Sequence, residues 1–300
     1  MTERSAHTLP PIEVVDEVGS TNAEMKTRAR AGAVHGSALQ ALAQTSGRGQ
    51  RAHTWTSPKG GLYLSILIRP EVPKEALPAL PVACALGALG ALREVGCVRA
   101  SLKWPNDIVV GDRKVAGILT ELVSSPAGVF AVCGIGVNMM TPAVMADERN
   151  CAALHPTGLI DELAPSAQAP SLPKLAEVVR AGVLDAVQGW TDAYGQGGVY
   201  VETGRPGSRV PGADPQRWIF DPVRAGAEGP LAPLLTPYNA CLAFVGARVR
   251  VIAIDGAEKA RGTFLGVDGY GHALVALDNG SVGTYEAADA SIRPVAQLAR

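Results

Sequence analysis

The chain has 300 residues, of which 47% are hydrophobic and 18% charged, and its 27 Lys and Arg residues against 28 Asp and Glu residues give a net charge of -1. This length suits roughly two domains of ~150 residues, and the balanced charge disfavours a protein dedicated to binding nucleic acid. The five cysteines are scattered and form neither a C-x-x-C motif nor a disulfide framework. We therefore expect reduced thiols in a cytoplasmic protein.

The first expected element is a helix over residues 22–31. Thr21 and Glu24 have the spacing of a capping box with the Thr21 hydroxyl as the cap, and Gly32 supplies a C-terminal stop. The chain start carries charges of both signs and lacks the apolar run of a secretory signal. Residues 76–92 are uncharged but include two prolines and are short for a ~20-residue membrane span. They predict a buried core helix that starts near Pro81, and no membrane association.

Strands are expected at residues 61–68, 100–103, 108–110, 115–123 and 129–138. In the first of these, leucine and isoleucine alternate with Tyr63, Ser65 and Leu67, so the period is two and the second face is partly polar. The turns at 111–112 and 124–128 are too short for a parallel return, which needs a crossover of about a dozen residues. The predicted fold class is therefore α+β, with a mixed, largely antiparallel sheet and flanking helices rather than a doubly wound sheet.

A further helix is expected over residues 172–194. The Gly- and Pro-rich residues 195–237 are interpreted as a long loop or insertion. Short β-rich runs at 248–254, 260–267, 272–277 and 282–285, separated by Asp-Gly and Asp-Asn-Gly turns, predict a small β-barrel. The predicted domains are residues 1–240 and a C-terminal barrel of residues 245–300.

The Gly- and Arg-rich residues 44–51 are the first candidate site. Their backbone N–H groups and the guanidinium groups of Arg48 and Arg51 can converge on one anion. An ordinary surface loop is the alternative for this composition. The chain has no Walker A motif, and Gly134-Ile135-Gly136 lacks the third glycine of a dinucleotide fingerprint, so the two commonest nucleotide-binding folds are not supported.

The second candidate is the run Lys103-Trp104-Pro105-Asn106-Asp107, which lies between two expected strands. If residues 111–112 form a hairpin, Asp107 and Lys114 face each other on adjacent strands, and the carboxylate can orient the ammonium group. A surface ion pair that contributes little to stability is the alternative.

Together these segments resemble the biotin protein ligases. The matching residues, in the family's order, are 20–22, 44–51 with Trp55, 57–58, 61–65, 103–108, 114–121 and 134–138. The resemblance implies a class II aminoacyl-tRNA synthetase/biotin synthetase-like catalytic fold with a small SH3-like C-terminal domain. It also implies two reactions in one site. The biotin carboxylate attacks the α-phosphate of ATP to give biotinyl-5'-AMP and pyrophosphate, and a lysine of a biotin carboxyl carrier protein then displaces AMP.

The resemblance also implies residue roles. Catalysis would fall to Arg48, Lys114 and Asp107, with Lys114 between the biotin carboxylate and the α-phosphate and Asp107 orienting or deprotonating the acceptor lysine. The biotin-binding residues would be Ser20, Thr21, Asn22, Gln44, Gly47, Arg48, Gly49, Gln50, Tyr63, Lys114, Gly117, Leu119, Gly134 and Gly136. The ATP-binding residues would be Arg48, Arg51, Trp55, Lys103, Asn106, Lys114 and Asn138, with Trp55 near the adenine. Mg²⁺ would be held mainly by the nucleotide, with no metal site of the protein's own.

Several points stay open at this stage. Ala52 and His53 stand where the family continues its glycine-arginine loop with glycine and a basic or polar residue, so retention of the intermediate is in question. The matching motifs begin too early for an N-terminal DNA-binding domain, so we expect a ligase without repressor function. Some members self-associate, and the sequence leaves a homodimer open. A lipoate ligase or octanoyl transferase, and an inactive module that binds carrier domains, are the alternatives.

Overall fold

The protein is described here by a computed structural model, which covers residues 9–52, 54–126, 128–142, 154–195 and 229–295. Seven strands of the described part form one sheet: β1 (Glu13–Val18), β2 (Ala38–Gln44), β3 (Leu62–Ile68), β4 (Ser101–Lys103), β5 (Asp107–Val110), β6 (Arg113–Ser125) and β7 (Gly128–Val137). Five more form a second sheet: β8 (Arg248–Ala253), β9 (Glu258–Val267), β10 (Ala273–Leu277), β11 (Val282–Tyr285) and β12 (Ala290–Pro294). The α-helices are α1 (Thr21–Arg30), α2 (Leu80–Glu94), α3 (Leu172–Gly195) and α4 (Leu235–Cys241).

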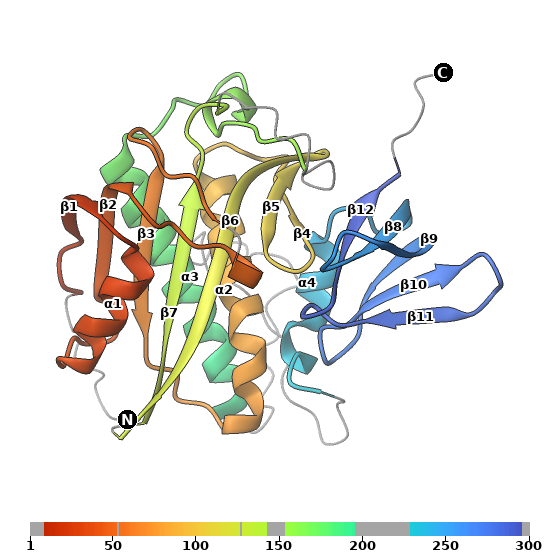
Figure 1. The fold of residues 1–300 in the computed structure, drawn as a ribbon. Helices are drawn as coiled ribbons and strands as arrows, with labels where there is room; N and C mark the ends of the chain where they lie inside the picture. Colours follow the sequence, from red (N-terminus) through yellow and green to blue (C-terminus); the bar gives the residue numbers. More distant parts are fainter. Residues whose placement is uncertain (1–8, 53, 127, 143–153, 196–228, 296–300) are drawn as a thin grey trace.

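The large sheet has the strand order β1-β2-β3-β7-β6-β5-β4 (Figure 1). Strands β1 and β2 pair in parallel and all other neighbours pair antiparallel, which confirms the predicted mixed, largely antiparallel sheet. The sequence analysis missed β1 and β2. The edge strand β1 is mostly exposed and lacks an apolar run, while β2 consists of Ala, Leu and Gln, which favour helices unless tertiary contacts override them.

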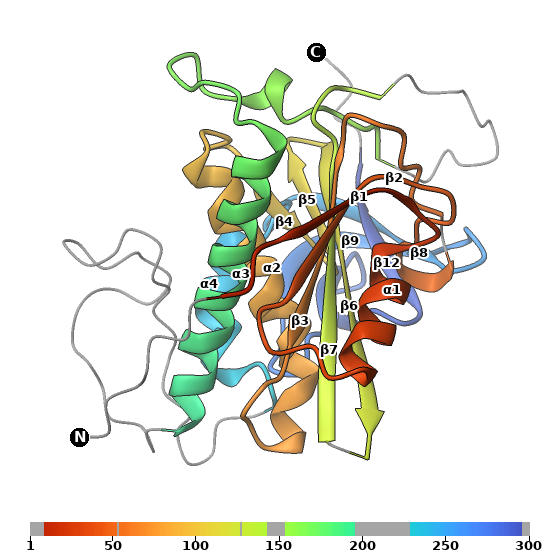
Figure 2. The same ribbon diagram turned by 90° about the vertical axis from the view of Figure 1, so that its left-hand side faces the viewer.

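Helices α2 and α3 cover one face of this sheet, and α1 lies on the other (Figure 2). The backbones of α2 and α3 approach closely where two glycines meet, since a Cβ on Gly87 would lie 2.6 Å from the Cα of Val183. The segment Lys74–Glu94 is apolar and long enough to cross a membrane by composition, but 72% of its most apolar window is buried. This confirms the predicted core helix and explains its apolar sequence.

Helix α1 starts differently from the prediction. Ser20, not Thr21, occupies the N-cap position, and no side-chain cap hydrogen bond is present there. The Thr21 hydroxyl instead donates to Gln44 Oε1, so the expected capping box is wrong. Gly32 follows the helix in the left-handed region, with φ of +100°, which confirms it as the stop.

The C-terminal sheet, of order β11-β10-β9-β8-β12, packs beside the edge strand β4 (Figure 1). Its five antiparallel strands fit the expected small SH3-like domain. The two outer strands, β11 and β12, are not paired with each other in the described residues, so the expected barrel is not closed there. The N–H of Ala243 donates to Leu102 O at 2.7 Å, and the Trp104 indole N–H donates to Gly271 O at 2.9 Å. One apolar cluster continues from the α2–α3 layer into this sheet.

The segment interpreted as a long loop is only partly described. Residues 196–228 lie outside the described residues. Its last part was wrongly expected to be irregular: Ala232–Leu234 forms a 3-10 helix that leads into α4, and Leu231 and Leu234 are buried. These leucines join the main apolar cluster, which holds the segment in place despite its Pro- and Gly-rich composition.

Glu162 anchors the chain beside strand β6. It is 2% exposed, accepts a hydrogen bond from the Thr157 hydroxyl at 2.8 Å, and pairs with Arg99 at 2.9 Å and Arg113 at 2.6 Å. The backbone N–H of Thr157 in turn donates to Lys114 O at 2.8 Å. The buried carboxylate therefore fixes the segment that runs alongside Lys114.

We expect Glu162→Ala to lower the free energy of unfolding by about 2–4 kcal/mol, because it leaves the buried Thr157 hydroxyl without an acceptor and removes two charged hydrogen bonds. Urea unfolding followed by circular dichroism measures the change. Glu94→Ala, at an exposed position at the end of α2, is the matched control and should stay within about 0.5 kcal/mol. Equal losses in the two variants would contradict the anchoring role.

Candidate functional site

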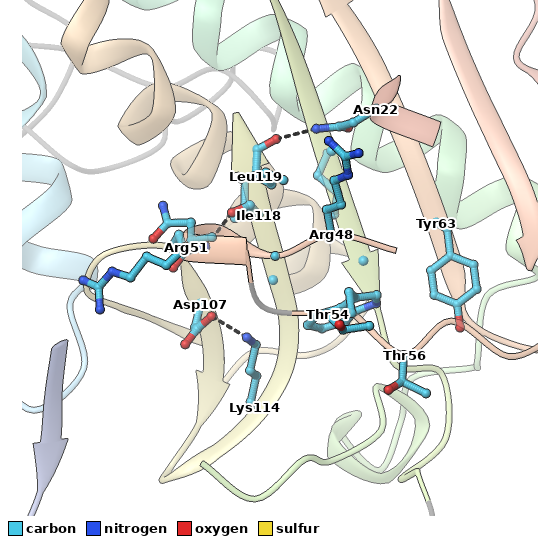
Figure 3. Close-up of a pocket in the computed structure, with 18 of the residues that line it drawn as sticks. Asn22, Arg48, Arg51, Thr54, Thr56, Tyr63, Asp107, Lys114, Ile118 and Leu119 are labelled. Carbon is cyan, nitrogen blue, oxygen red and sulfur yellow. Dashed lines mark hydrogen bonds and ion pairs between the residues drawn. The ribbon is translucent and has the colours of Figure 1, made fainter. Parts of the chain in front are cut away.

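A cavity of about 640 Å³ opens on the face of the large sheet that carries α1 (Figure 3). This volume lies within the range of ~300–1,000 Å³ typical of ligand-binding pockets. The sequence-predicted residues that line it are Ser20, Thr21, Asn22, Gln44, Arg48, Gly49, Gln50, Arg51, Trp55, Tyr63, Lys103, Asn106, Asp107, Lys114, Gly117, Leu119, Gly134 and Gly136. The fold therefore brings nearly all of the predicted residues to one place.

A polar network surrounds the first turn of α1. The backbone N–H and hydroxyl of Thr21 both donate to Gln44 Oε1, at 2.8 and 3.1 Å. The Ser65 hydroxyl lies 2.8 Å from Thr21 Oγ1 and 2.6 Å from Asn22 Oδ1. Gln44 Nε2 donates to Ser57 Oγ at 2.9 Å. Neutral hydrogen-bonding groups in fixed positions suit an uncharged polar ring.

Glu121 orients the Asn22 amide, and the sequence analysis missed it. Asn22 Nδ2 donates to Glu121 Oε2 at 2.9 Å and to Leu119 O at 3.2 Å, while Lys26 pairs with Glu121 at 2.7 Å. Burial alone would raise the pKa of Glu121, but the hydrogen bonds from Lys26 and Asn22 outweigh it and lower the pKa. The sequence could have indicated Glu121, because the period of two along β6 places it on the same face as Gly117 and Leu119.

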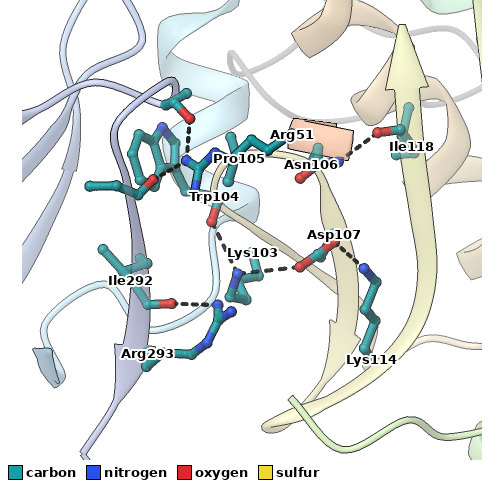
Figure 4. Close-up of polar contacts among 12 residues, drawn as sticks. Arg51, Lys103, Trp104, Pro105, Asn106, Asp107, Lys114, Ile118, Ile292 and Arg293 are labelled. Atoms are coloured by element: carbon teal, nitrogen blue, oxygen red, sulfur yellow. Dashed lines mark hydrogen bonds and ion pairs between the residues drawn. The ribbon is translucent and has the colours of Figure 1, made fainter. Parts of the chain in front are cut away.

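Asp107 lies between two lysines (Figure 4). Its carboxylate is 2.6 Å from Lys114 Nζ and 3.3 Å from Lys103 Nζ, which confirms the predicted proximity of Asp107 and Lys114. Burial would raise the pKa of Asp107, but the two ammonium groups hold it well below its usual range. Burial also lowers the pKa of Lys103 to about 8. Asp107 therefore stays ionised at neutral pH and orients Lys114.

We expect the free energy of unfolding to rise more steeply between about pH 8 and pH 10 in the unsubstituted protein than in Lys103→Met. Folded Lys103 has a pKa lowered to about 8 by burial, whereas an unfolded lysine titrates near ~10.4. Between these values the unfolded chain binds more protons than the folded one, so stability rises with pH by at most about 1.4 kcal/mol per pH unit. Urea unfolding across this range measures the difference, and parallel curves for the two proteins would contradict it.

The Trp55 indole lies inside the cavity, against the sheet. A Cβ on Gly117 would lie 2.9 Å from Trp55 Cζ3, and one on Gly136 would lie 2.6 Å from Trp55 Cε2. Lys114 Nζ is 4.9 Å from the ring centroid, within the range of a cation–π contact. The two glycines thus leave room on the sheet, and the indole fills it. Trp55 Nε1 is buried without a hydrogen-bond partner in the described structure, which leaves a donor for an acceptor on a bound molecule.

Arg48 and Arg51 diverge rather than converge on one point. The Arg48 side chain extends toward Asn22 (Figure 3). Arg51 adopts a left-handed backbone conformation, with φ of +55°, and its guanidinium group donates to the carbonyls of Ala287 and Ala290. Arg51 thus links the loop to the C-terminal sheet and also lines the cavity, and its predicted nucleotide contact stays a prediction.

Strand β12 completes the cavity wall, which the sequence analysis did not foresee. Ser291 and Arg293 line the cavity from the C-terminal sheet. Arg293 lies near Lys103 and Asp107 (Figure 4). No local pattern points to Ser291 or Arg293, because this contact joins segments far apart in the chain.

Two predicted residues lie behind the cavity rather than in its lining. The carbonyl of Gly47 accepts from the Trp55 N–H at 2.9 Å, and a Cβ on Gly47 would lie 2.6 Å from Ser57 Oγ. Asn138 Nδ2 donates to the carbonyls of Lys114, at 3.5 Å, and Thr157, at 3.3 Å. Both position neighbours instead of facing the cavity. His53, named in the sequence analysis, and one of the five cysteines, Cys151, lie outside the described residues.

The charges of the lining define what the cavity can bind. Five cationic side chains, Arg48, Arg51, Lys103, Lys114 and Arg293, face it, whereas Asp107 is the only carboxylate among the described lining residues. Such a cavity favours an anion beside the neutral polar network at α1. The described residues hold no group of three His, Cys, Asp or Glu side chains that could bind a metal ion.

Comparisons with known proteins agree on one family. The model of the biotin/lipoate A/B protein ligase family matches residues 20–138. A biotin–[acetyl-CoA-carboxylase] ligase of Paracoccus denitrificans is 36% identical over 164 residues, which cover 49% of this chain and 67% of that protein. The bifunctional ligase/repressor BirA of Bacillus subtilis (strain 168) is 30% identical over 174 residues, covering 57% of this chain. The match spans only 50% of that relative's length.

Among solved structures, the biotin protein ligase from Aquifex aeolicus in complex with biotin and ATP superposes with a TM-score of 0.67. The superposition covers 96% of this chain and 100% of that chain, at 21% sequence identity. The fold described above, including the C-terminal sheet, is therefore the fold of that structure.

Proposed function

Because the chain belongs to the biotin/lipoate A/B protein ligase family, we propose that it joins biotin to a lysine of a biotin carboxyl carrier protein with ATP as the energy source. One observation carries the proposal: the neutral side chains of Thr21, Asn22 and Gln44 line the same cavity as the Lys114–Asp107 pair. An uncharged ureido ring fits the first part, and a carboxylate next to a phosphate fits the second.

In the first step, a biotin carboxylate oxygen bonds to the α-phosphorus of ATP as the bond to pyrophosphate breaks. Such a transfer needs positioning and stabilisation of negative charge more than covalent help from the protein. Lys114 suits this role because Asp107, at 2.6 Å, and the Trp55 ring fix its ammonium group. Arg48 adds positive charge on the side of the neutral network.

Mg²⁺ would be bound through the phosphates of the nucleotide. Asp107 is the only carboxylate in the described lining and is already engaged by Lys103 and Lys114. Mg²⁺ retains water and phosphate ligands readily with few protein carboxylates, so this donor set fits a metal that enters with ATP. When bound, the ion would neutralise phosphate charge.

In the second step, the acceptor lysine attacks as its neutral amine, its nitrogen bonds to the carbonyl carbon of biotinyl-5'-AMP as the bond to the AMP oxygen breaks, and the proton released from the nitrogen passes to solvent. The low pKa of Asp107, held down by its two lysines, makes it a weak base. It is better suited to orienting the incoming amine by accepting a hydrogen bond than to deprotonating it.

We expect Asp107→Asn to slow transfer from preformed biotinyl-5'-AMP at least about tenfold, since the amide accepts a weaker hydrogen bond and no longer orients Lys114. Single-turnover transfer to a carrier domain measures this rate independently of adenylation. An unchanged rate would remove Asp107 from the second step.

Biotin-dependent ATP–pyrophosphate exchange tests the proposed function, with lipoate and octanoate as parallel substrates. Exchange with biotin alone supports the ligase. Exchange with lipoate or octanoate in place of biotin favours a lipoate ligase or octanoyl transferase, and no exchange with any acid favours an inactive module that binds carrier domains.

The proposed ligase acts in the cytoplasm, without a nucleic acid partner. Cys84, Cys97, Cys133 and Cys241 are buried free thiols, in keeping with a reducing compartment. Self-association stays a prediction that light scattering of the purified chain would check.

A further inference from the structure

Lys114 lies at a β-bulge near the start of β6. Within one step along β5, the paired residue of β6 shifts from Ala116 to Lys114, so Val115 is an extra residue on β6. The Val115 side chain is buried in the main apolar cluster, whereas the Lys114 side chain lines the cavity (Figure 3). A bulge next to an active site changes the direction of a side chain. The direction of the Lys114 side chain therefore depends on the contacts that hold this bulge.

A separate segment pairs with the bulge. The Lys114 N–H donates to His155 O at 2.8 Å, and the Thr157 N–H donates to Lys114 O at 2.8 Å. In the described structure, β7 pairs with β6 only from Ala116 onward, so residues 155–157 take its place beside Lys114. The backbone of Lys114 is thus held by a segment that belongs to neither neighbouring strand.

Glu162 binds both of these chains with one oxygen. Its Oε1 accepts a hydrogen bond from the Thr157 hydroxyl at 2.8 Å and lies 2.6 Å from a guanidinium nitrogen of Arg113. Arg113 directly precedes Lys114 on β6, and Thr157 lies on the segment that pairs with Lys114. The Glu162 side chain is fully buried, and hydrogen bonds to a charged group are stronger where water is excluded. One carboxylate oxygen therefore joins the two chains that hold Lys114.

The other oxygen of Glu162 makes a contact that does not involve the bulge. Oε2 lies 2.9 Å from a guanidinium nitrogen of Arg99, which precedes β4. The side chains of Arg99 and Arg113 are 67% and 50% exposed, and neither is among the described residues that line the cavity. The two arginines thus neutralise the same carboxylate, but only Arg113 belongs to the strand that carries Lys114.

We propose that Glu162 is a positioning residue for the formation of biotinyl-5'-AMP, which acts through Arg113 and Thr157 to set the direction of the Lys114 side chain. The inference rests on the proposed ligase function and adds a residue outside the cavity on which its first step depends. A displacement of about 1 Å at a reacting centre can lower a rate by about 100-fold. Loss of one of the two links should therefore cause a partial loss of rate.

The test compares Arg113→Gln and Thr157→Val with Arg99→Gln. The two arginine variants are matched, because each removes one exposed charge from the same carboxylate. Biotin-dependent ATP–pyrophosphate exchange gives the maximal rate and KM for biotin, and calorimetry without ATP gives the Kd for biotin. Thermal melting is recorded for every variant, and exchange is measured below the melting range.

We expect Arg113→Gln and Thr157→Val each to lower the maximal exchange rate about tenfold, with KM and Kd for biotin changed by less than about twofold. The hydrogen bonds of Asn22 and Gln44 do not involve Glu162, so biotin binding is unaffected. Arg99→Gln should retain the exchange rate within about twofold. Both arginine variants should melt alike, because an exposed ion pair contributes little to stability.

A second comparison asks whether Glu162 acts through Lys114. Single-turnover formation of biotinyl-5'-AMP is measured for Lys114→Ala with and without Arg113→Gln. Because the ammonium group is absent in both proteins, its direction no longer matters, and the second substitution should add less than about twofold.

The proposal is overturned by an unchanged rate in Arg113→Gln, by an equal loss in Arg99→Gln, or by a further tenfold loss, about as large as in the unsubstituted protein, on the Lys114→Ala background. The first two results would leave Glu162 as an anchor of the fold, and the third would show that Arg113 acts independently of Lys114. Each of them, with normal exchange in the unsubstituted protein, contradicts only the positioning role. Absent exchange in the unsubstituted protein contradicts the ligase function and the positioning role together.

Discussion

Replacement of Lys114 by alanine is expected to reduce biotin-dependent ATP–pyrophosphate exchange by about 10²–10³-fold. Loss of a single preorganised donor to a developing oxyanion has an effect of this size. Lys114 is held 2.6 Å from Asp107 and 4.9 Å from the centre of the Trp55 ring, so its ammonium group is fixed before substrates bind. No other described cation has both contacts, and none can substitute for it.

Lys174→Ala is the control for this variant, because Lys174 is exposed on α3 and remote from the cavity. Lys114→Arg retains the charge but changes its shape and reach, and should recover only part of the exchange. An alanine variant with near-normal exchange would show that the Lys114–Asp107 pair is merely structural.

Gly134→Ala is expected to raise KM for biotin by about 30- to 100-fold. A Cβ at Gly134 would lie 2.8 Å from Asn22 Cγ, closer than real contacts allow. Strand β7 cannot move away, because Gly134 pairs with Ser65 on one side and Leu119 on the other. Asn22 would therefore turn and lose its bonds to Leu119 and Glu121. Loss of these two partly buried hydrogen bonds, at about 1–1.5 kcal/mol each, leaves the Asn22 amide without a fixed orientation toward biotin. At about 1.4 kcal/mol per tenfold, this energy corresponds to the expected rise in KM.

Steady-state exchange over a range of biotin concentrations separates KM from the maximal rate, which we expect to change less. Gly19→Ala is the matched control, since a Cβ there meets no atom within 4 Å. If both variants bind biotin normally, the Asn22 amide does not recognise it.

The sequence predicts the central meander well because its signals are local. Alternation along residues 61–68 and the short turn at Gly111 fix strand directions, and these place Asp107 and Lys114 on adjacent strands without any long-range information. Asp107 is paired with Gly117 and Lys114 with Val109, and the two side chains meet diagonally at 2.6 Å. The same pattern does not predict strand β2, because its Ala, Leu and Gln residues have no period of two. Only burial between β1 and β3 makes this segment a strand.

The candidate site also has a part that the sequence predicts and a part that it does not. The residues that line the cavity come from motifs recognisable in order along the chain, so their gathering was predictable. The side chain that fills the space over Gly117 and Gly136 was not predictable, because Trp55 reaches this space through a loop whose path no local pattern determines. Arg293 enters from the far end of the chain for the same reason.

The hydrogen bonds from Arg51 to Ala287 and Ala290 connect the glycine-arginine loop to the C-terminal sheet. These contacts couple the ordering of the loop to the packing of the C-terminal sheet against the rest of the protein. Such coupling is reciprocal. An interaction that orders the loop also favours the packed position of the sheet, and an interaction that packs the sheet favours the ordered loop by the same factor. The contacts of the small C-terminal sheet thus help to hold the loop in place, and those of the loop help to hold the sheet.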